Sequence, residues 1–195
     1  MVQLRRPSQA AIAARLGLPD QQFSYPEVAA TAELGSPLPR SLAAIYNVDR
    51  HEFSLGKGRD LFERSRAALG AWRHFEIPWL ELHGATTEVR SGQVVATLIS
   101  VVGLWFLSPC RVVYAELSAD ENLAAFAYGT LCGHVEAGEE RFTVRFNSRT
   151  EEVVYEIDAF SRPATILAKL GYPLTRRLQR RFALSSAEAL AGAVA

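Results

Sequence analysis

The sequence predicts an α+β fold in which a mainly antiparallel, curved sheet grips a long C-terminal helix. Apolar and polar side chains alternate in residues 141–146 and again in residues 155–159, the period of a strand with one buried face. The connection between them, residues 147–152, is short enough for an antiparallel hairpin. Farther along, an apolar stripe recurs at every fourth position, as on one face of a helix: Ile166, Leu170, Leu174, Leu178 and Phe182.

The composition is that of a protein able to fold on its own. The chain has 195 residues, of which 49% are apolar, enough for a substantial core. Its 21 basic residues balance 21 acidic ones, so we expect no nucleic-acid partner. The longest apolar run, residues 94–107, is interrupted by polar residues and a glycine and is too short to span a bilayer as a helix. Stable membrane insertion is therefore not expected.

Cysteine usage indicates a reducing environment. Cys110 and Cys132 are too few for a disulfide scaffold and lack metal-ligand spacing. They predict a cytoplasmic location, unpaired thiols and neither a metal nor another cofactor. No apolar run of signal-peptide length precedes Asp20, which fits the same location.

The first 50 residues divide into an arm and an irregular stretch. Residues 1–20 predict a short helix that forms an N-terminal arm, beginning at a Pro-Ser pair and ending at Gly17. No linker, repeat or low-complexity tract divides residues 21–195, so these are expected to form one domain. Within them, three prolines in residues 23–50 predict an extended loop with one strand near Ile45.

The middle of the chain predicts a helix followed by a run of strands. Apolar side chains gather on one side of a helix from Arg59 to Phe75. Pro78 and Gly84 then introduce extended segments separated by turn or polar residues. The predicted strands are Trp79–His83, Gln93–Val101, Leu104–Leu117, Ala124–Leu131, Glu140–Phe146 and Val153–Phe160.

A long helix is predicted to follow the sheet and to lie across its apolar face. Ser161 stands just before Pro163, which is close to the usual order of a helix cap and an early proline. The helix is expected to run to about Leu190. Because Pro173 removes a backbone donor, a kink is expected near Lys169–Tyr172.

Several longer segments resemble one family. These segments are residues 23–28, 55–58, 61–72, 110–114, 126–131, 133–136, 138–142 and 160–163. They are similar to the uncharacterised family catalogued as domain of unknown function 1990, and the resemblance runs from about Phe23 to Leu190. The chain departs from the family's pattern at Ala29, where a glycine is usual, and at Cys132, where a proline is usual.

The order of elements also resembles the helix-grip fold of the START-like and birch-pollen-allergen-like superfamily. In members of that superfamily the fold encloses an apolar cavity for lipids, sterols, polyketides or hormones, so the resemblance implies a cavity here. Fold does not determine function. Aromatic strand residues either line such a cavity or simply fill the core, and a buried tyrosine hydroxyl needs a partner. The candidate ligand-binding residues are Trp105, Tyr114, Tyr128, His134, Phe142, Tyr155 and Arg181.

The densest polar cluster surrounds two glycines and comprises His134, Glu136, Glu139 and Glu140. An extended backbone would place the first two on one face, which suits a metal or an acid/base pair. A solvated loop between strands explains the cluster equally well and is the favoured interpretation. Cys132 lies two residues from His134, but sequence proximity does not establish a catalytic pair, and a structural cysteine is favoured.

Four arginines stand close together in the C-terminal helix: Arg176, Arg177, Arg180 and Arg181. A solvated helix face is favoured over a site for acidic lipid, nucleic acid or an acidic protein. The helical period places Arg176 and Arg180 toward solvent and Arg181 at the border of the apolar arc. We expect Arg181 at the rim of any cavity, paired with an internal carboxylate or with an acidic ligand head group, the former being favoured.

The function predicted from these patterns is binding of a small apolar or amphipathic molecule between sheet and helix, without a cofactor. One alternative is a cyclase- or hydrolase-like enzyme that uses the same cavity, with tyrosines, His134 or Glu136 transferring protons. Another is an interaction module whose core is filled. An apolar cavity favours binding, a polar pair at its end favours the enzyme, and a filled cavity favours the module. No oligomeric state is predicted.

Overall fold

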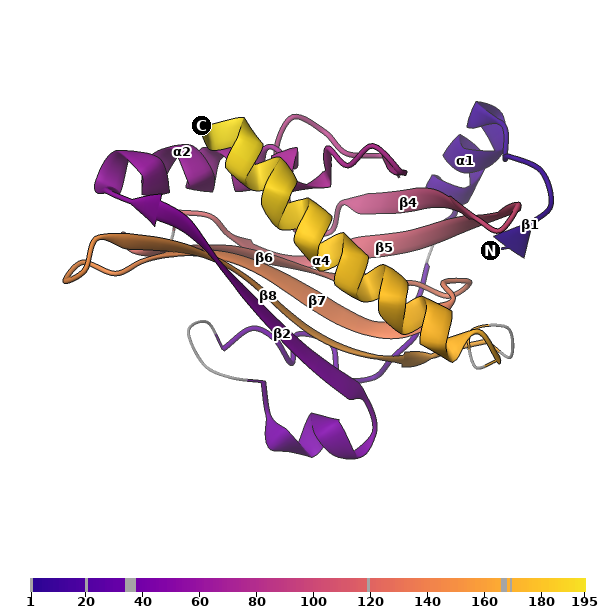
Figure 1. Ribbon diagram of the computed structural model, residues 1–195. Coiled ribbons are helices and arrows are strands. Elements are labelled where there is room, and N and C mark those ends of the chain that lie inside the picture. Colours follow the sequence, from indigo (N-terminus) through magenta and orange to yellow (C-terminus); the bar gives the residue numbers. More distant parts are fainter. Residues whose placement is uncertain (1, 20, 34–37, 119, 166–167, 169) are drawn as a thin grey trace.

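The computed structural model describes residues 2–19, 21–33, 38–118, 120–165, 168 and 170–195, and its strands form one sheet (Figure 1). The strands are β1 (Val2–Gln3), β2 (Asn47–Lys57), β3 (Leu80–His83), β4 (Val94–Val101), β5 (Leu104–Glu116), β6 (Leu123–Thr130), β7 (Glu136–Phe146) and β8 (Glu152–Pro163). The helices are α1 (Gln9–Leu16), α2 (Arg59–Gly70) and α4 (Tyr172–Val194), with 3-10 turns at Arg40–Ala44 and Arg73–Phe75.

All strand pairs given for the described residues are antiparallel. The eight strands follow the order β2-β8-β7-β6-β5-β4-β3, with β1 beside β5. Each strand from β3 to β8 neighbours the next one along the chain, so short connections suffice. The predicted antiparallel sheet is confirmed.

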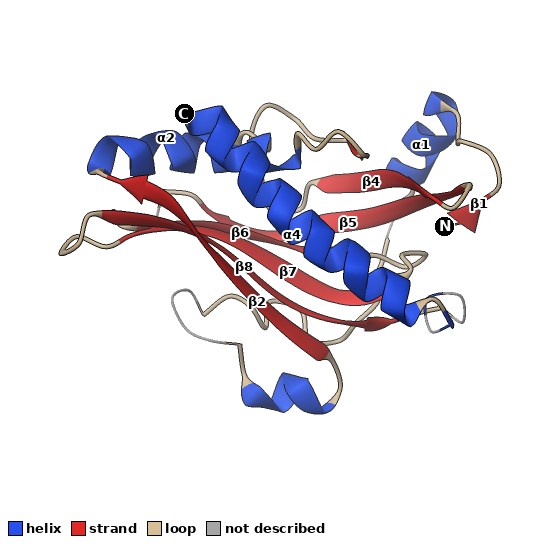
Figure 2. Cartoon of the chain, in the orientation of Figure 1, coloured by secondary structure: helices blue, strands red, loops and turns tan. Residues whose placement is uncertain are grey.

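Helix α4 crosses one face of this sheet diagonally, and α2 lies beside the C-terminal half of α4 (Figure 2). Phe142 and Val144 on β7 alternate with polar residues, as predicted, and pack in the core with Leu190 of α4. The prediction of a helix across the apolar face is confirmed. No helix in the described ranges combines the length and the apolar character needed to cross a bilayer.

The opposite face of β7 and β8 is polar but buried. The Arg141 and Asp158 side chains are each 2% exposed, and their Nη2 and Oδ2 atoms lie 2.6 Å apart. Residues 23–33 cover this face: the carbonyl of Thr31 accepts from Arg141 at 2.8 Å, and its backbone N–H donates to Glu139 at 3.0 Å. Alternation predicts polarity but does not show that a loop from another part of the chain shields it.

The N-terminal arm packs on this opposite face. The Ser8 hydroxyl accepts from the backbone N–H of Ala11 at 3.2 Å and caps α1, and Gly17 follows its last residue. Ile12 is buried against Leu98 of β4 and other apolar residues of β4 and β5. The short helix and its bounds agree with the capping residues in the sequence.

Strand β2 is later and longer than the strand predicted near Ile45. A 3-10 turn precedes it, and β2 pairs with β8 from Asn47 to Lys57, with a register shift between Ser54 and Gly56. Gly56 has a φ of 132°, which a side chain would disfavour. Because β2 is paired with a strand about 100 residues away, local sequence gave little sign of its length.

The helix predicted over residues 59–75 ends at Gly70. Trp72 has a left-handed backbone with φ 62°, which interrupts the helix before the 3-10 turn Arg73–Phe75. The interruption brings the Trp72 ring to 5.1 Å from the ring of Phe126, measured between centroids. The helix is therefore shorter than predicted because its apolar end enters the core.

The prediction that the C-terminal helix begins at Ser161 is wrong. Strand β8 continues to Pro163, pairing with β7 up to Glu136 and with β2 at Asn47. Two partner strands satisfy the backbone there, and Pro163 ends the strand, where a missing donor is tolerated. The cap-and-proline pattern is therefore overridden by strand pairing.

A turn at Gly171 separates α4 from the helical residues Ala168 and Leu170, so the helix is interrupted within the range where the kink was predicted. Helix α4 begins at Tyr172, and Pro173 lies in its first turn, where the backbone N–H has no helical partner to lose. Ile166 and Lys169, which belonged to the predicted stripe and kink, lie outside the described residues. Pro173 therefore initiates α4.

Candidate functional site

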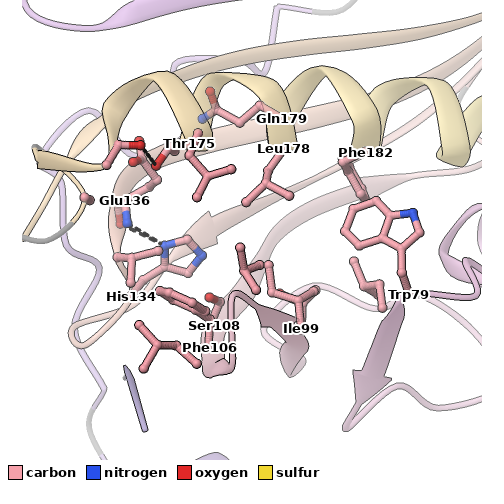
Figure 3. A pocket seen from close by; sticks show the side chains of 18 of the residues that line it. Trp79, Ile99, Phe106, Ser108, His134, Glu136, Thr175, Leu178, Gln179 and Phe182 are labelled. Carbon is pink, nitrogen blue, oxygen red and sulfur yellow. Dashed lines mark hydrogen bonds between the residues drawn. The ribbon is translucent and has the colours of Figure 1, made fainter. Parts of the chain in front are cut away.

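A cavity of about 280 Å³ lies between the first half of α4 and strands β4 and β5 (Figure 3). Leu174, Leu178 and Phe182 face it from α4, each four residues from the next. Alternate residues of the two strands face it from below, including Ile99 and Phe106. The described lining residues are Trp79, Leu80, Thr97, Ile99, Val101, Val102, Leu104, Phe106, Ser108, Tyr128, His134, Val135, Glu136, Ala168, Gly171, Leu174, Thr175, Leu178, Gln179 and Phe182.

The two ends of this cavity differ in chemistry. Trp79 and Phe182 lie at one end, and His134 and Glu136 lie at the other (Figure 3). Between them the walls are mainly aliphatic and aromatic. A molecule with an apolar body and one polar end matches this arrangement.

The polar end is organised by a turn at Gly133, whose φ is 94°. The backbone N–H of Glu136 donates to Nδ1 of His134 at 2.9 Å. Nδ1 also lies 3.0 Å from the carbonyl oxygen of Glu136, so the backbone of Glu136 fixes the orientation of the ring. Burial lowers the pKa of His134 to about 4, so the ring is neutral near pH 7.

A second cavity, of about 160 Å³, adjoins the polar end. The two cavities share five lining residues: Tyr128, His134, Glu136, Gln179 and Phe182. The second cavity adds the carboxyl group of Glu140, which accepts from the Tyr128 hydroxyl at 2.6 Å. Four of the shared residues are polar and Phe182 is apolar, so the junction between the apolar space and the more acidic one is mainly polar.

Two carboxyl groups at this junction titrate near neutral pH. Burial raises the pKa of Glu140 to about 7, although the hydrogen bond from Tyr128 opposes the rise. Burial likewise raises the pKa of Glu136 to about 7, opposed by Ser161 and Arg176. Carboxyl groups with such pKa values can both give and take protons near pH 7.

The interpretation of the glutamate cluster as a solvated loop is wrong. Glu136, Glu139 and Glu140 belong to β7, which is paired on one side with β6 and on the other with β8. Glu136 and Glu139 are buried. Glu139 lies on the face covered by residues 23–33, where it accepts from the Tyr25 hydroxyl at 2.6 Å, and so it anchors that loop.

The seven predicted ligand-binding residues fall into four groups. Tyr128 and His134 line the cavity. Phe142 and Tyr155 lie on the same face of the sheet but in the packed core, where the Tyr155 hydroxyl lies 2.8 Å from Oγ of Ser186. The core fills this part of the face because α2, the 3-10 turn after it and the second half of α4 cover β7 and β8.

Trp105 and Tyr114 lie on the opposite face of the sheet and do not line the cavity. Trp105 packs near Ile12 of α1, and its neighbour Phe106 takes the cavity position. Tyr114 donates its hydroxyl to the carbonyl of Thr31 at 2.8 Å. A register shift between residues 112 and 114 of β5 reverses the alternation, which is why Tyr114 does not continue the cavity face.

The arginine cluster is only partly solvated. Arg181 is exposed, and its guanidinium carbon lies 4.5 Å from the centre of the Trp79 ring, at the apolar end of the cavity. The favoured internal carboxylate partner is not found for it in the described part of the chain. Arg176, predicted to face solvent, instead forms a bidentate pair with Asp49 of β2 at 2.5 Å per contact. The helical period alone does not show that β2 lies close enough to contact the Arg176 side chain.

Sequence reasoning missed several residues of the cavity. Strand alternation could have placed Phe106 and Ser108 on one face, and it could have separated Phe106 from Trp105. Glu140 is paired with Tyr128 across β6 and β7, which requires knowledge of the register. Trp79 stands before β3 in the chain and carried no periodic signal.

The remaining reactive groups do not assemble into a metal site. No group of three or more His, Cys, Asp or Glu side chains among the described residues could hold a metal ion. Cys110 is buried, which raises the pKa of its thiol, and Cys132 is exposed; both thiols are free. Nδ1 of His134 is occupied by the backbone of Glu136, not by Cys132.

Comparisons with known proteins agree with this architecture. The profile of a family described as Domain of unknown function (DUF1990) matches residues 24–189. A UPF0548 protein of Dictyostelium discoideum is 32% identical over 187 residues, covering 90% of this chain and 87% of that protein.

The solved structures that resemble the fold include the following two. The hypothetical protein jhp0584 from Helicobacter pylori has a TM-score of 0.55 and 11% identity, covering 89% of this chain and 96% of that one. The Zhui aromatase/cyclase from Streptomyces sp. R1128 has a TM-score of 0.54 and 16% identity, covering 76% of this chain and 93% of that one. At these identities the likeness shows the fold alone, and the predicted helix-grip architecture is confirmed.

Proposed function

The chain belongs to the DUF1990 family, and from the cavity between its sheet and α4 we propose that it binds a small apolar or amphipathic molecule there. The observation that carries the proposal is the unfilled volume of about 280 Å³ with mainly apolar walls. This volume is close to the lower end of the range for small-molecule pockets, about 300 Å³. Removing apolar ligand surface from water supplies the driving force.

The same volume argues against a module whose core is filled. Side chains pack closely behind the cavity, where Phe142 and Tyr155 are fully buried, so the core itself is well filled. The larger opening lies where α4 stands over β4 and β5. A mainly apolar opening beside a closely packed core is better explained by an external ligand than by loose packing.

Native mass spectrometry of the purified protein, compared with its denatured mass, tests for a retained small molecule. Binding is then measured with Nile red, a neutral apolar dye whose emission rises in apolar surroundings. Leu178→Trp should fill the cavity and weaken dye binding at least about tenfold, which corresponds to about 1.4 kcal/mol. Leu184→Trp is the matched control, because Leu184 is on the same helix and 57% exposed. Equal dye binding by both variants would contradict the proposal.

A second candidate function is catalysis in the same cavity. Two features at the polar end favour it: the hydrogen bond between Tyr128 and Glu140, and the carboxyl group of Glu136. Both carboxyl groups have a pKa raised to about 7. Such groups suit the proton transfers of a cyclase or hydrolase. If a retained molecule is recovered, its conversion by the wild-type protein and not by Glu140→Gln would support catalysis. An unchanged mass after prolonged incubation would support binding alone.

A cytoplasmic location remains part of the proposal. The two free thiols, Cys110 and Cys132, support it because a reducing environment keeps such groups unpaired. Microscopy of the tagged protein in its own cells tests it, and a signal confined to the cell exterior would contradict it.

A further inference from the structure

The polar end of the larger cavity contains a carboxyl oxygen without a hydrogen-bond partner. Glu136 is 7% exposed and lines both cavities, and its Oε1 has no partner among the described residues. Figure 3 shows its side chain beside His134 at one end of the cavity. A buried oxygen in this state is unfavourable, and a donor on a bound molecule would satisfy it.

The charged side chains that line the cavities near this oxygen are acidic. Neither cavity has a lysine or arginine among its described lining residues, whereas Asp49 and Glu140 join Glu136 in lining the smaller one. Glu139 also belongs to that lining, but its carboxyl group is held on the opposite face of the sheet by Tyr25 and Thr31. The charge of Arg176 acts on Glu136, but both Oδ atoms of Asp49 hold its guanidinium at 2.5 Å. A carboxylate or phosphate brought here would find no free cation and would stand beside carboxyl groups.

Arg181, the cation beside the apolar end, does not line the cavity. It is exposed and lies over the Trp79 ring, outside the described lining. Trp79 and Phe182 form an apolar end wall. The tail of an amphipathic molecule therefore fits at Trp79, and its polar group fits at Glu136.

Building on the proposed function, we propose that the cavity selects amphipathic molecules whose polar end donates a hydrogen bond, as an amine or hydroxyl does, and that Glu136 Oε1 accepts it. Molecules that end in a carboxylate or phosphate are excluded. Burial raises the pKa of Glu136 and Glu140 to about 7, so both are largely ionised at pH 8, where the contrast is greatest. His134, with its pKa lowered to about 4, remains neutral there.

Three ligands with the same tail test the selection: octylamine, octanol and octanoate, each measured by displacement of Nile red at pH 8. Octylamine should displace the dye at a concentration at least about tenfold lower than octanoate, because an ammonium–carboxylate bond is charge-assisted. The concentration of octanol needed to displace the dye should lie between those of octylamine and octanoate. This comparison uses only the wild-type protein and does not depend on any variant folding.

The variant Glu136→Gln tests whether Glu136 is the residue responsible for the preference for amines over carboxylates. The substitution should weaken octylamine about tenfold and bring octanoate to within about threefold of octylamine, since the negative charge is lost. Glu188→Gln is the matched control, an exposed glutamate on α4 whose substitution should leave the order unchanged.

The possible results separate this inference from the proposed function. If Nile red does not bind, the proposed function fails and this inference fails with it. If the dye binds but octanoate displaces it as well as octylamine does, only the selection is overturned. An unchanged amine preference in Glu136→Gln would overturn the assignment to Glu136.

Discussion

The Tyr128 hydroxyl donates a hydrogen bond of 2.6 Å to the Glu140 carboxyl group, directly across the pairing of β6 with β7. This hydrogen bond positions the titratable carboxyl group of Glu140 beside the residues that the two cavities share. Tyrosine deprotonation is strongly opposed there, because burial and the charge of Glu140 raise the pKa of Tyr128. The hydroxyl therefore remains a donor at all pH values at which the fold is tested.

Glu140→Gln should stabilise the protein in a pH-dependent manner. The pKa of Glu140 is raised from 4.5 to about 7, so the folded state retains a proton that the unfolded state loses between these values. This group's contribution to stability therefore falls as pH rises from 4.5 to 7. The free energy of unfolding that the variant gains over the wild type should increase across this pH range and reach about 2 kcal/mol. Urea unfolding at pH 5 and pH 8 measures it, and an equal gain at both values would contradict the assignment.

His74→Phe should reduce acid destabilisation. His74 is fully buried among aromatic rings, neither ring nitrogen has a partner among the described residues, and burial lowers its pKa to about 3. Between pH 6.5 and 3 the unfolded state binds the proton and the folded state does not, so stability falls as pH falls. The slope from this residue is more than about 1 kcal/mol per pH unit. Unfolding curves from pH 6.5 to 4.5 should be flatter for the variant; parallel curves would show that His74 is not responsible.

Arg176→Ala should destabilise α4 over the cavity. The guanidinium binds both Oδ atoms of Asp49 on β2, and both side chains are about four-fifths buried. Loss of a partly buried bidentate pair should cost on the order of 1–2 kcal/mol and weaken Nile red binding. Arg180→Ala, four residues along the same helix and exposed, should change neither. Similar thermal midpoints for the two variants would show that the ion pair contributes little.

Gly138→Ala should be among the most harmful small substitutions. A Cβ atom at Gly138 would lie 1.9 Å from the backbone oxygen of Phe160 on β8, a clash that only strand separation can relieve. We expect a loss of at least about 2 kcal/mol. Gly192→Ala in α4 meets no atom within 4 Å and should be neutral or slightly stabilising. Chemical denaturation of both variants checks this, and a stable Gly138→Ala variant would mean that β7 and β8 are farther apart.

The local periods in the sequence determined the main elements. Phe142 and Val144 alternate with polar residues because successive strand side chains point to opposite faces, and both lie in the core. Leu174, Leu178 and Phe182 stand four apart because that spacing returns to one side of a helix, and all three face the cavity. The short links between strands likewise favoured an antiparallel sheet, and longer motifs indicated the family.

Only the tertiary structure decided where these elements stop and what they face. Ser161 and Pro163 have the pattern of a helix start, yet two neighbouring strands keep them extended. Tyr114 has the parity of the cavity face, yet a register shift in β5 turns it to the other side. The acids Glu136 and Glu140 resemble loop residues in a row of charges, but pairing of β7 on both sides places them at the cavity's polar end, with Glu136 buried and Glu140 half-buried. Each outcome depends on partners distant in the chain, and local periodicity contains no information about those partners.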